Sequence, residues 1–304
     1  MEKQLSVEEL KALKKKNKIK EAKTDYVYYV ICGIILFLLA VIVIYPLYYI
    51  VIASFSDPDA IMRGDVWLYP VKMTFSGYEK LFNRSDIWHG YGNTLLYTLF
   101  GTVFNVVLTI PAGWALSRDY LPFRKVIMVL LIITMFFGGG LVPYVMLCTS
   151  LGLYQNPLIL VIGGGVSVYN VFMCKSFFES NVPKEVLEAG QIDGAGEIRT
   201  FFDLVLPISK SIISVMILFY AVGHWNNYID AYIFGLEEQF YPLQTILDGL
   251  MKATGGEGEV VLEQMRAATQ IKFTSIIVAT VPILILYPMI EKHFGQGVLV
   301  GSFK

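Results

Sequence analysis

Residues 126–174 read VIMVLLIITMFFGGGLVPYVMLCTSLGLYQNPLILVIGGGVSVYNVFMC, and none of them is Asp, Glu, Lys or Arg. A hydrophobic stretch of about 18 or more uncharged residues is already a candidate transmembrane helix. These 49 residues are long enough for two such helices. Residues 150–157, in the middle of the stretch, contain the Gly, Asn and Pro expected of a turn. The stretch therefore predicts a protein that crosses a membrane more than once.

Four other stretches of the chain are also free of charge, at 26–56, 87–117, 211–229 and 273–290. Together with the first stretch they predict six transmembrane helices, near residues 27–54, 93–117, 126–148, 157–175, 211–236 and 272–291. We therefore expect an all-α polytopic membrane protein. Its domain organisation is a Lys-rich segment at 1–25 followed by a six-helix domain at 26–304.

The composition supports this fold class, because 55% of the 304 residues are hydrophobic and only 16% are charged. Soluble proteins carry about 25% charged residues. The net charge of −1 argues against a basic nucleic-acid-binding protein. Three cysteines are also too few for a secreted domain held together by disulfides.

The orientation of the helices follows from the distribution of Lys and Arg. Seventeen of the 24 basic residues lie in the segments on the side of the N-terminus, and seven lie in the others. Because cytoplasmic loops carry the excess of Lys and Arg, both termini are expected in the cytoplasm. The loop at 176–210 is then cytoplasmic and the loop at 237–271 extracellular. Segment 1–25 holds eight Lys and is interpreted as a topology anchor with a short helix from Val7, or alternatively as a lipid-binding segment.

The cytoplasmic loop contains two predicted short helices. Asn181 can cap a first helix that runs to about Gln191, with Pro183 in its first turn. Gly194 provides a break, and a second helix is expected at 195–205, ended by Pro207. The loop also keeps a fixed spacing, Glu-Ala-Gly at 188–190, Gly194 after three residues, and Leu-Val-Leu-Pro at 204–207 after nine more.

This spacing resembles the EAA motif of the membrane subunits of binding-protein-dependent ABC importers, which reads E-A-A, three residues, G, nine residues, I, one residue, L-P. Gly190 replaces the third Ala and Leu204 replaces the Ile. Further segments resemble the carbohydrate-uptake (MalG-type) permeases, and within them an LplC-like subgroup. These segments are FGGGLVP at 137–143, SVYN at 167–170, FYAVGHWN at 219–226, YPLQ at 241–244 and GVLVGS at 297–302.

The resemblance implies a type I ABC importer permease fold and a non-catalytic pore subunit. It implies pairing with a second homologous permease in a heterodimeric pore. Two cytoplasmic ATPase subunits would use ATP and Mg, and an extracellular solute-binding lipoprotein would deliver a carbohydrate, an oligosaccharide. The chain itself would bind no cofactor or metal, and it would lie in the cytoplasmic membrane of a Gram-positive bacterium. The resemblance assigns coupling to the ATPase to Glu188, Ala189, Gly190, Asp193, Gly194, Ala195, Leu206 and Pro207.

The source of energy can be checked in the sequence. A P-loop needs a Gly followed by Lys, and no Gly in this chain is followed by Lys. Energy must therefore come from another subunit or from an ion gradient. An ABC importer of a non-sugar solute is one alternative. A secondary transporter would need intramembrane acids, and a membrane enzyme would need catalytic groups at one depth, whereas the three His are scattered.

Polar residues inside the bilayer are costly and often functional. Tyr220, His224 and Asn227 follow one stripe of the fifth predicted helix. Aromatic and amide side chains suit a sugar, which has apolar faces and hydroxyl edges. The residues expected along the translocation path are Tyr169, Asn170, Tyr220, His224, Asn226 and Asn227. The alternative is that these groups bond neighbouring helices or belong to the outer aromatic belt.

Three glycine-rich segments have two readings each. The triplets at 138–140 and 163–165 indicate close helix packing, or a local unwinding that a moving bundle could use. The external segment Gly255–Glu259 is either a flexible solvated loop or a part that touches the binding protein.

Overall fold

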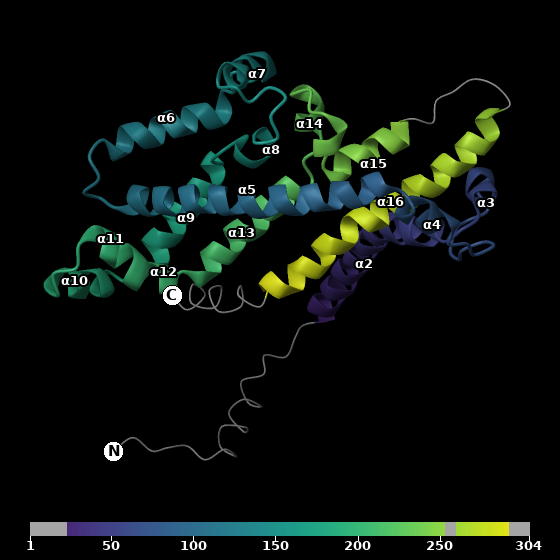
Figure 1. Cartoon of the computed structure of the whole chain (residues 1–304). Helices are drawn as coiled ribbons and strands as arrows, with labels where there is room; N and C mark the ends of the chain where they lie inside the picture. The colour runs from purple at the N-terminus through teal and green to yellow at the C-terminus, as the bar shows by residue number, and fades with distance from the viewer. Residues whose placement is uncertain (1–22, 253–259, 292–304) are drawn as a thin grey trace. The chain divides into compact units, whose positions relative to one another are not determined.

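The computed structural model describes residues 23–252 and 260–291, and this part of the chain is helical without strands. The chain divides into two units, Met1–Ile52 and Ala53–Lys304, and each is described separately. Helix α2 (Lys23–Ser54) forms the described part of the first unit and extends two residues beyond it (Figure 1). After its first turn this helix is apolar on all faces. The predicted helix from Val7, the segment Gly255–Glu259 and the segment at 297–302 lie outside the described residues.

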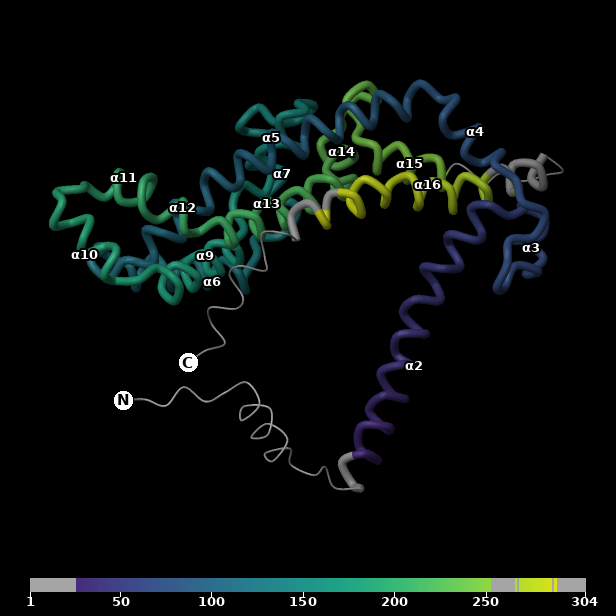
Figure 2. Tube along the Cα trace, turned by 90° about the horizontal axis from the view of Figure 1, so that it is seen from below, coloured from purple at the N-terminus to yellow at the C-terminus, as the bar shows by residue number. Residues whose placement is uncertain are grey.

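The second unit is built along helix α5 (Ser85–Ser117), which is 33 residues long, about 50 Å at the rise of an α-helix. Helices α9 (Val168–Asn181) and α13 (Lys210–Trp225) lie beside it (Figures 1 and 2). Their shared core holds Ile110 and Trp114 from α5, Phe178 from α9 and Met216 from α13. These apolar side chains bury one face of each helix and hold the three helices together.

Close approach to α5 depends on glycine at two positions. A Cβ atom at Gly101 would overlap the ring of His224, and a Cβ at Gly113 would overlap Cβ of Cys174. The absence of a side chain therefore lets α13 and α9 lie directly against α5.

The N-terminal half of α5 packs among short helices and the long helix α16 (Val260–Glu291). The short helices are α3 (Pro58–Arg63), α4 (Ser76–Phe82), α14 (Ile229–Ile233), the 3₁₀ turn η2 (Glu238–Phe240) and α15 (Leu243–Lys252). Leu81, Leu243 and Val278 share a buried cluster here. The opposite end of α5 lies near the short helices α10 (Lys184–Ile192), α11 (Glu197–Arg199) and α12 (Leu206–Ile208) (Figures 1 and 2).

Two predicted helices are broken, so the expectation of continuous helices at 126–148 and 157–175 is wrong. The first is divided into α6 (Arg124–Phe136) and α7 (Leu141–Ser150), which meet at 115°. The second is divided into α8 (Ile159–Ile162) and α9. A hydrophobic run shows that a segment enters the bilayer, but it does not show where the backbone turns.

The glycine triplets explain both breaks. Gly140 and Gly164 have φ of +85° and +74°, a conformation that a side chain disfavours. Among the described residues, nothing lies within 4 Å of a Cβ built at Gly138 or Gly139. The described residues therefore give no close packing at the first triplet, whereas a Cβ built at Gly163 would lie 3.3 Å from the Tyr144 hydroxyl, and both triplets interrupt helices.

The other helix limits also differ from the predicted ones. The helix expected at 211–236 ends at Trp225, where Asn226 caps it and the chain turns toward α14. The helices expected at 93–117 and 272–291 begin earlier, at Ser85 and Val260, because polar turns extend them beyond their apolar stretches.

By length and composition, three helices of the described residues can span a bilayer, within Tyr26–Ser54, Ser85–Ser117 and Ala268–Ile285. Two bent helix pairs raise the number to as many as five. The apolar helices make the chain an integral membrane protein, while six spans and cytoplasmic termini stay predictions.

We predict that Gly113→Ala lowers the free energy of unfolding by about 1–3 kcal/mol, because the new methyl group overpacks the contact with Cys174. Thermal unfolding of the detergent-solubilised protein measures this loss. Gly92→Ala is the matched control in the same helix, since none of the described residues has an atom within 4 Å of its Cβ position. Equal stability of the two variants would contradict the close approach of α9 to α5.

Candidate functional site

The loop at 176–210, which the sequence predicts to be cytoplasmic, folds into two short helical segments. The first is α10 (Lys184–Ile192), in agreement with the prediction that it runs to about Gln191. The second consists of α11 (Glu197–Arg199), a π-helical turn η1 (Thr200–Val205) and α12 (Leu206–Ile208). We call residues 184–208 the coupling loop, after the role that the sequence predicts for them.

Two details of the predicted loop are wrong. Asn181 ends α9 instead of capping α10, and its side-chain amide donates to the carbonyl of Phe177, so Pro183 occupies the cap position. Pro207 does not end the second segment at residue 205, since it lies in the first turn of α12. A proline is tolerated there because the backbone N–H groups of the first turn of a helix have no carbonyl partner within the helix, so a residue without an N–H loses no hydrogen bond.

The turn of the coupling loop is fixed by two glycines. Gly194 has a φ of +73°, and the N–H of Ala195 donates to the carbonyl of Gly190 over 2.9 Å. Gly190 is buried, and a Cβ built on it would lie 2.8 Å from Cδ1 of Leu204. Gly190 and Leu204, the two residues that depart from the EAA motif, thus face each other. The methyl group of an Ala at position 190 would overlap the Cδ1 methyl group of Leu204.

The coupling loop has one covered face and one open face. Leu187, Phe201 and Val205 pack into the core around Trp114. Ile192 and Ile198 are 86% and 77% exposed, and Phe202 is 59% exposed. The motif residues Glu188, Ala189, Asp193 and Pro207 are exposed, and Ala195 and Leu206 are half-buried. An amphipathic loop with an uncovered apolar face is suited to contact another protein.

The turn that follows α5 contacts the coupling loop through polar groups. The hydroxyl of Tyr120 donates to the carboxylate of Glu197. Burial, assisted by this hydrogen bond, raises the pKa of Tyr120 to about 12. The guanidinium of Arg118 lies 3.9 Å from the centre of the Trp114 ring, and burial lowers its pKa. The turn and the loop therefore share directional as well as apolar contacts.

Polar residues inside the bundle form a second group, centred on α5. Nε2 of His224 lies 2.6 Å from Oδ1 of Asn105, and its Nδ1 lies 3.1 Å from the carbonyl of Leu160. The Asn105 amide donates to the carbonyl of Gly165. Asn105 was missed by sequence reasoning, although an amide in the middle of the charge-free stretch 87–117 was a usable signal.

Tyr220 makes a similar link one turn away. Its hydroxyl lies 2.6 Å from Oγ1 of Thr109 and accepts a hydrogen bond from the N–H of Ser167 over 3.2 Å. Tyr220 and His224 thus fasten α13 to α5 and to the break before α9. The contacts of these two residues match the alternative prediction, in which the polar groups form hydrogen bonds with neighbouring helices.

The other expected path residues lie apart from this group. Asn170 is buried in α9 and takes no part in these links. Asn227 donates to the carboxylate of Asp230 over 2.8 Å within the turn after α13. Tyr169 and Asn226 are exposed, and the Asn226 amide donates only to the nearby carbonyl of Val222.

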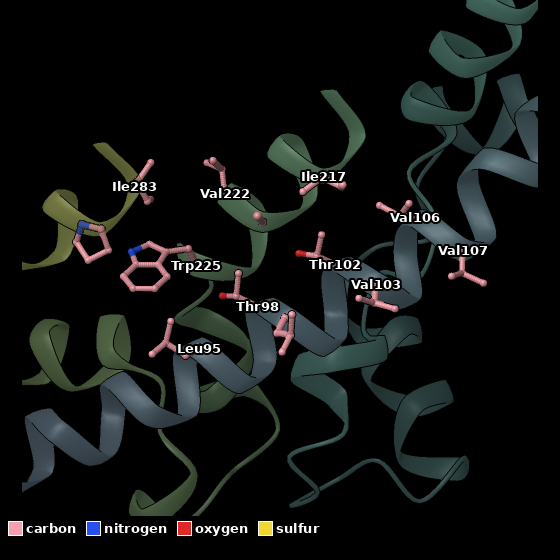
Figure 3. Close-up of a pocket in the computed structure, with 13 residues that line it drawn as sticks. Leu95, Thr98, Thr102, Val103, Val106, Val107, Ile217, Val222, Trp225 and Ile283 are labelled. Carbon is pink, nitrogen blue, oxygen red and sulfur yellow. The ribbon is translucent and has the colours of Figure 1, made fainter. Parts of the chain in front are cut away.

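A groove of about 520 Å³ lies between α5, α13 and α16 (Figure 3). Leu95, Val103, Ile217 and Ile283 are among its apolar lining residues. The hydroxyls of Thr98 and Thr102, the polar groups that line it from α5, have no partner among the described residues. A saccharide needs many hydrogen-bonding groups, so this groove fits an apolar occupant rather than a sugar.

Comparisons with known proteins identify the family. Residues 87–300 match the family described as "Binding-protein-dependent transport system inner membrane component". The chain belongs to this family. It is therefore a transporter permease subunit with the type I ABC permease fold, set in a membrane by apolar helices.

Individual relatives agree with this assignment. The permease is 31% identical to Protein LplC of Bacillus subtilis (strain 168), over 86% of this chain and 90% of the relative. It is also 31% identical to the polygalacturonan/rhamnogalacturonan transport system permease protein YtcP of the same organism, over 88% of this chain and 95% of the relative. Among solved structures it resembles a chain of a bacterial ABC transporter involved in the import of the acidic polysaccharide alginate. That match has a TM-score of 0.81 and 27% identity, over 91% of this chain and 100% of the other.

We predict that His224→Ala destabilises the permease, because it leaves the Oδ1 of buried Asn105 without its partner. The expected loss is about 1–2 kcal/mol in detergent-solubilised protein, measured by thermal unfolding. Asn226→Ala serves as the control, since it removes an exposed amide with one local bond. If both variants unfold like the wild type, the hydrogen bond between α13 and α5 does not contribute to stability.

We predict that Gly190→Ala costs about 1 kcal/mol of stability through its overlap with Leu204, and that adding Leu204→Ile restores most of the loss. The second change restores the residue of the motif. Gly196→Ala combined with Leu204→Ile is the control pair, because no atom of the described residues lies within 4 Å of a Cβ built at Gly196. Additive effects of the Gly190 and Leu204 changes would show that the two positions do not depend on each other.

Proposed function

We propose that this permease is one of two homologous subunits that form the heterodimeric pore of an ABC importer, and that the importer takes up a carbohydrate, an oligosaccharide. The observation that carries the proposal is the coupling loop, with its fixed turn at Gly194 and its open apolar face. The substrate class is supported by the relatives, whose names state transport of polygalacturonan and rhamnogalacturonan and import of alginate.

The proposed energy source is a pair of cytoplasmic ATPase subunits that bind ATP and Mg. The permease is not an enzyme in this proposal and holds no cofactor or metal. Ile192 and Ile198 on the open face would be covered by the ATPase, where apolar burial stabilises the contact. Glu188, Ala189, Gly190, Asp193, Gly194, Ala195, Leu206 and Pro207 would carry the motion of the ATPase into the bundle. Such coupling requires two states that differ in their contacts.

The proposed topology has six spans, formed by α2, α5, α6 with α7, α8 with α9, α13 and α16. Residues 197–208 stay outside the bilayer because Glu197, Arg199 and Asp203 are exposed on them. Both termini and the loop at 176–210 are cytoplasmic, and the loop at 237–271 faces an extracellular solute-binding lipoprotein. Segment 1–25 precedes the permease domain at 26–304. The membrane is the cytoplasmic membrane of a Gram-positive bacterium, in agreement with the Bacillus relatives.

The translocation path is proposed to include Tyr169, Asn170, Tyr220, His224, Asn226 and Asn227. Tyr169 and Asn226 are the members with the most open side chains and are the best candidates to touch a sugar. Tyr220 and His224 would act through the helices that they hold.

We predict that Ile198→Glu reduces co-purification of the ATPase with this permease at least about tenfold, because a carboxylate would be buried without a partner. The measurement is the amount of ATPase recovered with the tagged permease under mild detergent. Met62→Glu, on the opposite end of the unit, introduces the same charge and should leave recovery unchanged. Equal recovery of the ATPase with both variants would contradict docking on the open face.

Uptake into proteoliposomes that contain the whole complex tests the substrate class. Labelled oligogalacturonides and alginate oligosaccharides represent acidic saccharides, and labelled raffinose represents a neutral one. ATP-dependent uptake of any of the three supports the proposal. Uptake that follows an ion gradient without ATP would indicate a secondary transporter, and ATP-dependent uptake of amino acids or peptides alone would indicate a non-sugar importer.

A further inference from the structure

The contact between the coupling loop and the rest of the bundle is mostly apolar. The ring centre of Phe201, in the loop, lies 6.0 Å from that of Trp114 in α5. The Trp114 ring in turn lies 5.5 Å from the ring of Phe178 in α9. Apolar contacts of this kind have no fixed direction, so they allow one surface to slide or tilt against the other. A part that transmits motion also needs contacts that define an angle.

One directional contact meets this need. Of the residues that the structure describes, the Tyr120–Glu197 pair makes the only side-chain hydrogen bond between residues 184–208 and the rest of the bundle. It joins the turn after α5 to the first turn of the second helical segment. A hydrogen bond to a carboxylate is among the stronger and more directional contacts in proteins.

The turn that carries Tyr120 is itself held firmly. Nε of Arg124 donates to the carbonyl of Leu116 over 2.7 Å, and its guanidinium pairs with Asp119 and Glu179. Nζ of Lys175 lies 2.7 Å from the Glu179 carboxylate. These contacts fasten the turn to the end of α5 and to α9, so Tyr120 projects from a fixed base.

The first turn of the second segment has few contacts besides the one to Tyr120. Glu197, Ile198 and Arg199 are all exposed, and among the described residues the Arg199 side chain pairs only with Asp203 of its own segment. Within the turn, the N–H of Thr200 donates to the carbonyl of Gly196. Phe201 and Val205 hold the rest of the segment by apolar packing, so the directional part of its attachment to α5 depends on Glu197.

We infer that Tyr120 is a positioning residue for energy coupling: its hydrogen bond to Glu197 fixes the second segment of the coupling loop to the cytoplasmic end of α5. The inference rests on the proposed function of the loop. Helix α5 also carries Asn105 and Thr109, which bind His224 and Tyr220 of α13. A displacement of the loop is thus passed to α5 and from there to the helices that α5 holds.

Tyr120→Phe tests the inference, because it removes the hydroxyl and keeps the ring. In proteoliposomes with the whole complex, the labelled saccharide transported per ATP hydrolysed should fall roughly tenfold, while ATP hydrolysis continues. Tyr69→Phe is the control, since it removes the same kind of hydroxyl from an exposed tyrosine that lies outside both the coupling loop and the turn that carries Tyr120. It should keep the wild-type ratio of transport to hydrolysis.

Changes at Glu197 separate the hydrogen bond from the charge. Glu197→Gln keeps an acceptor for Tyr120 and should keep most of the coupling, whereas Glu197→Ala should match Tyr120→Phe. Combining Tyr120→Phe with Glu197→Ala should lower the ratio no further, because both changes remove one contact. Additive losses, or a loss in Tyr69→Phe equal to that in Tyr120→Phe, would overturn the inference.

Hydrogen exchange of the isolated permease gives a readout that does not depend on transport. The amides of residues 197–201 should exchange several-fold faster in Tyr120→Phe than in the wild type. Unchanged exchange together with unchanged coupling would overturn the role of Tyr120. A wild-type complex without ATP-dependent uptake would instead contradict the proposed function, which is a distinct outcome.

Discussion

A polar group inside a bilayer must find its partner within the protein, since hydrocarbon offers none. Asn105, in the middle of α5, satisfies this constraint by contacting His224 of α13 and donating to the carbonyl of Gly165. The bond to Gly165 is possible because the glycine triplet at 163–165 interrupts the helix and frees a carbonyl. The break, the close approach at Gly101 and the hydrogen bonds therefore depend on one another. They make α5 the element against which α9 and α13 are placed.

The coupling loop is attached at the C-terminal end of the same helix. Trp114 provides the apolar surface for Phe201, and Tyr120 in the turn after Ser117 provides the hydrogen bond to Glu197. The loop presents one face to α5 and leaves the other uncovered. In the proposed importer, this arrangement places a single rigid helix between the surface that meets the ATPase and the polar contacts inside the membrane.

The sequence predicted the parts of this arrangement that follow local rules. The first helix of the coupling loop and the turn at Gly194 were predictable, because a positive φ favours glycine and the motif spacing is short. The contact of Asn105 with His224 was not, because 119 residues separate them and no local pattern links them. The interruption between α6 and α7 was predicted only as one of two readings of the triplet at 138–140, and its angle was not predictable, since hydropathy carries no information on backbone direction. The predicted helix end before Pro207 was wrong because a proline can either end a helix or lie in the first turn of one, and the sequence does not distinguish the two.

In the proposed importer, residues 184–208 are the surface through which an ATPase drives this permease. A structure of the complete complex by electron cryomicroscopy, purified through this chain, tests this role. We expect an ATPase subunit bound to the open face, with Ile192 and Ile198 buried in the contact. A complex that contains no ATPase, or one in which an ATPase binds elsewhere and leaves both side chains in solvent, would contradict it.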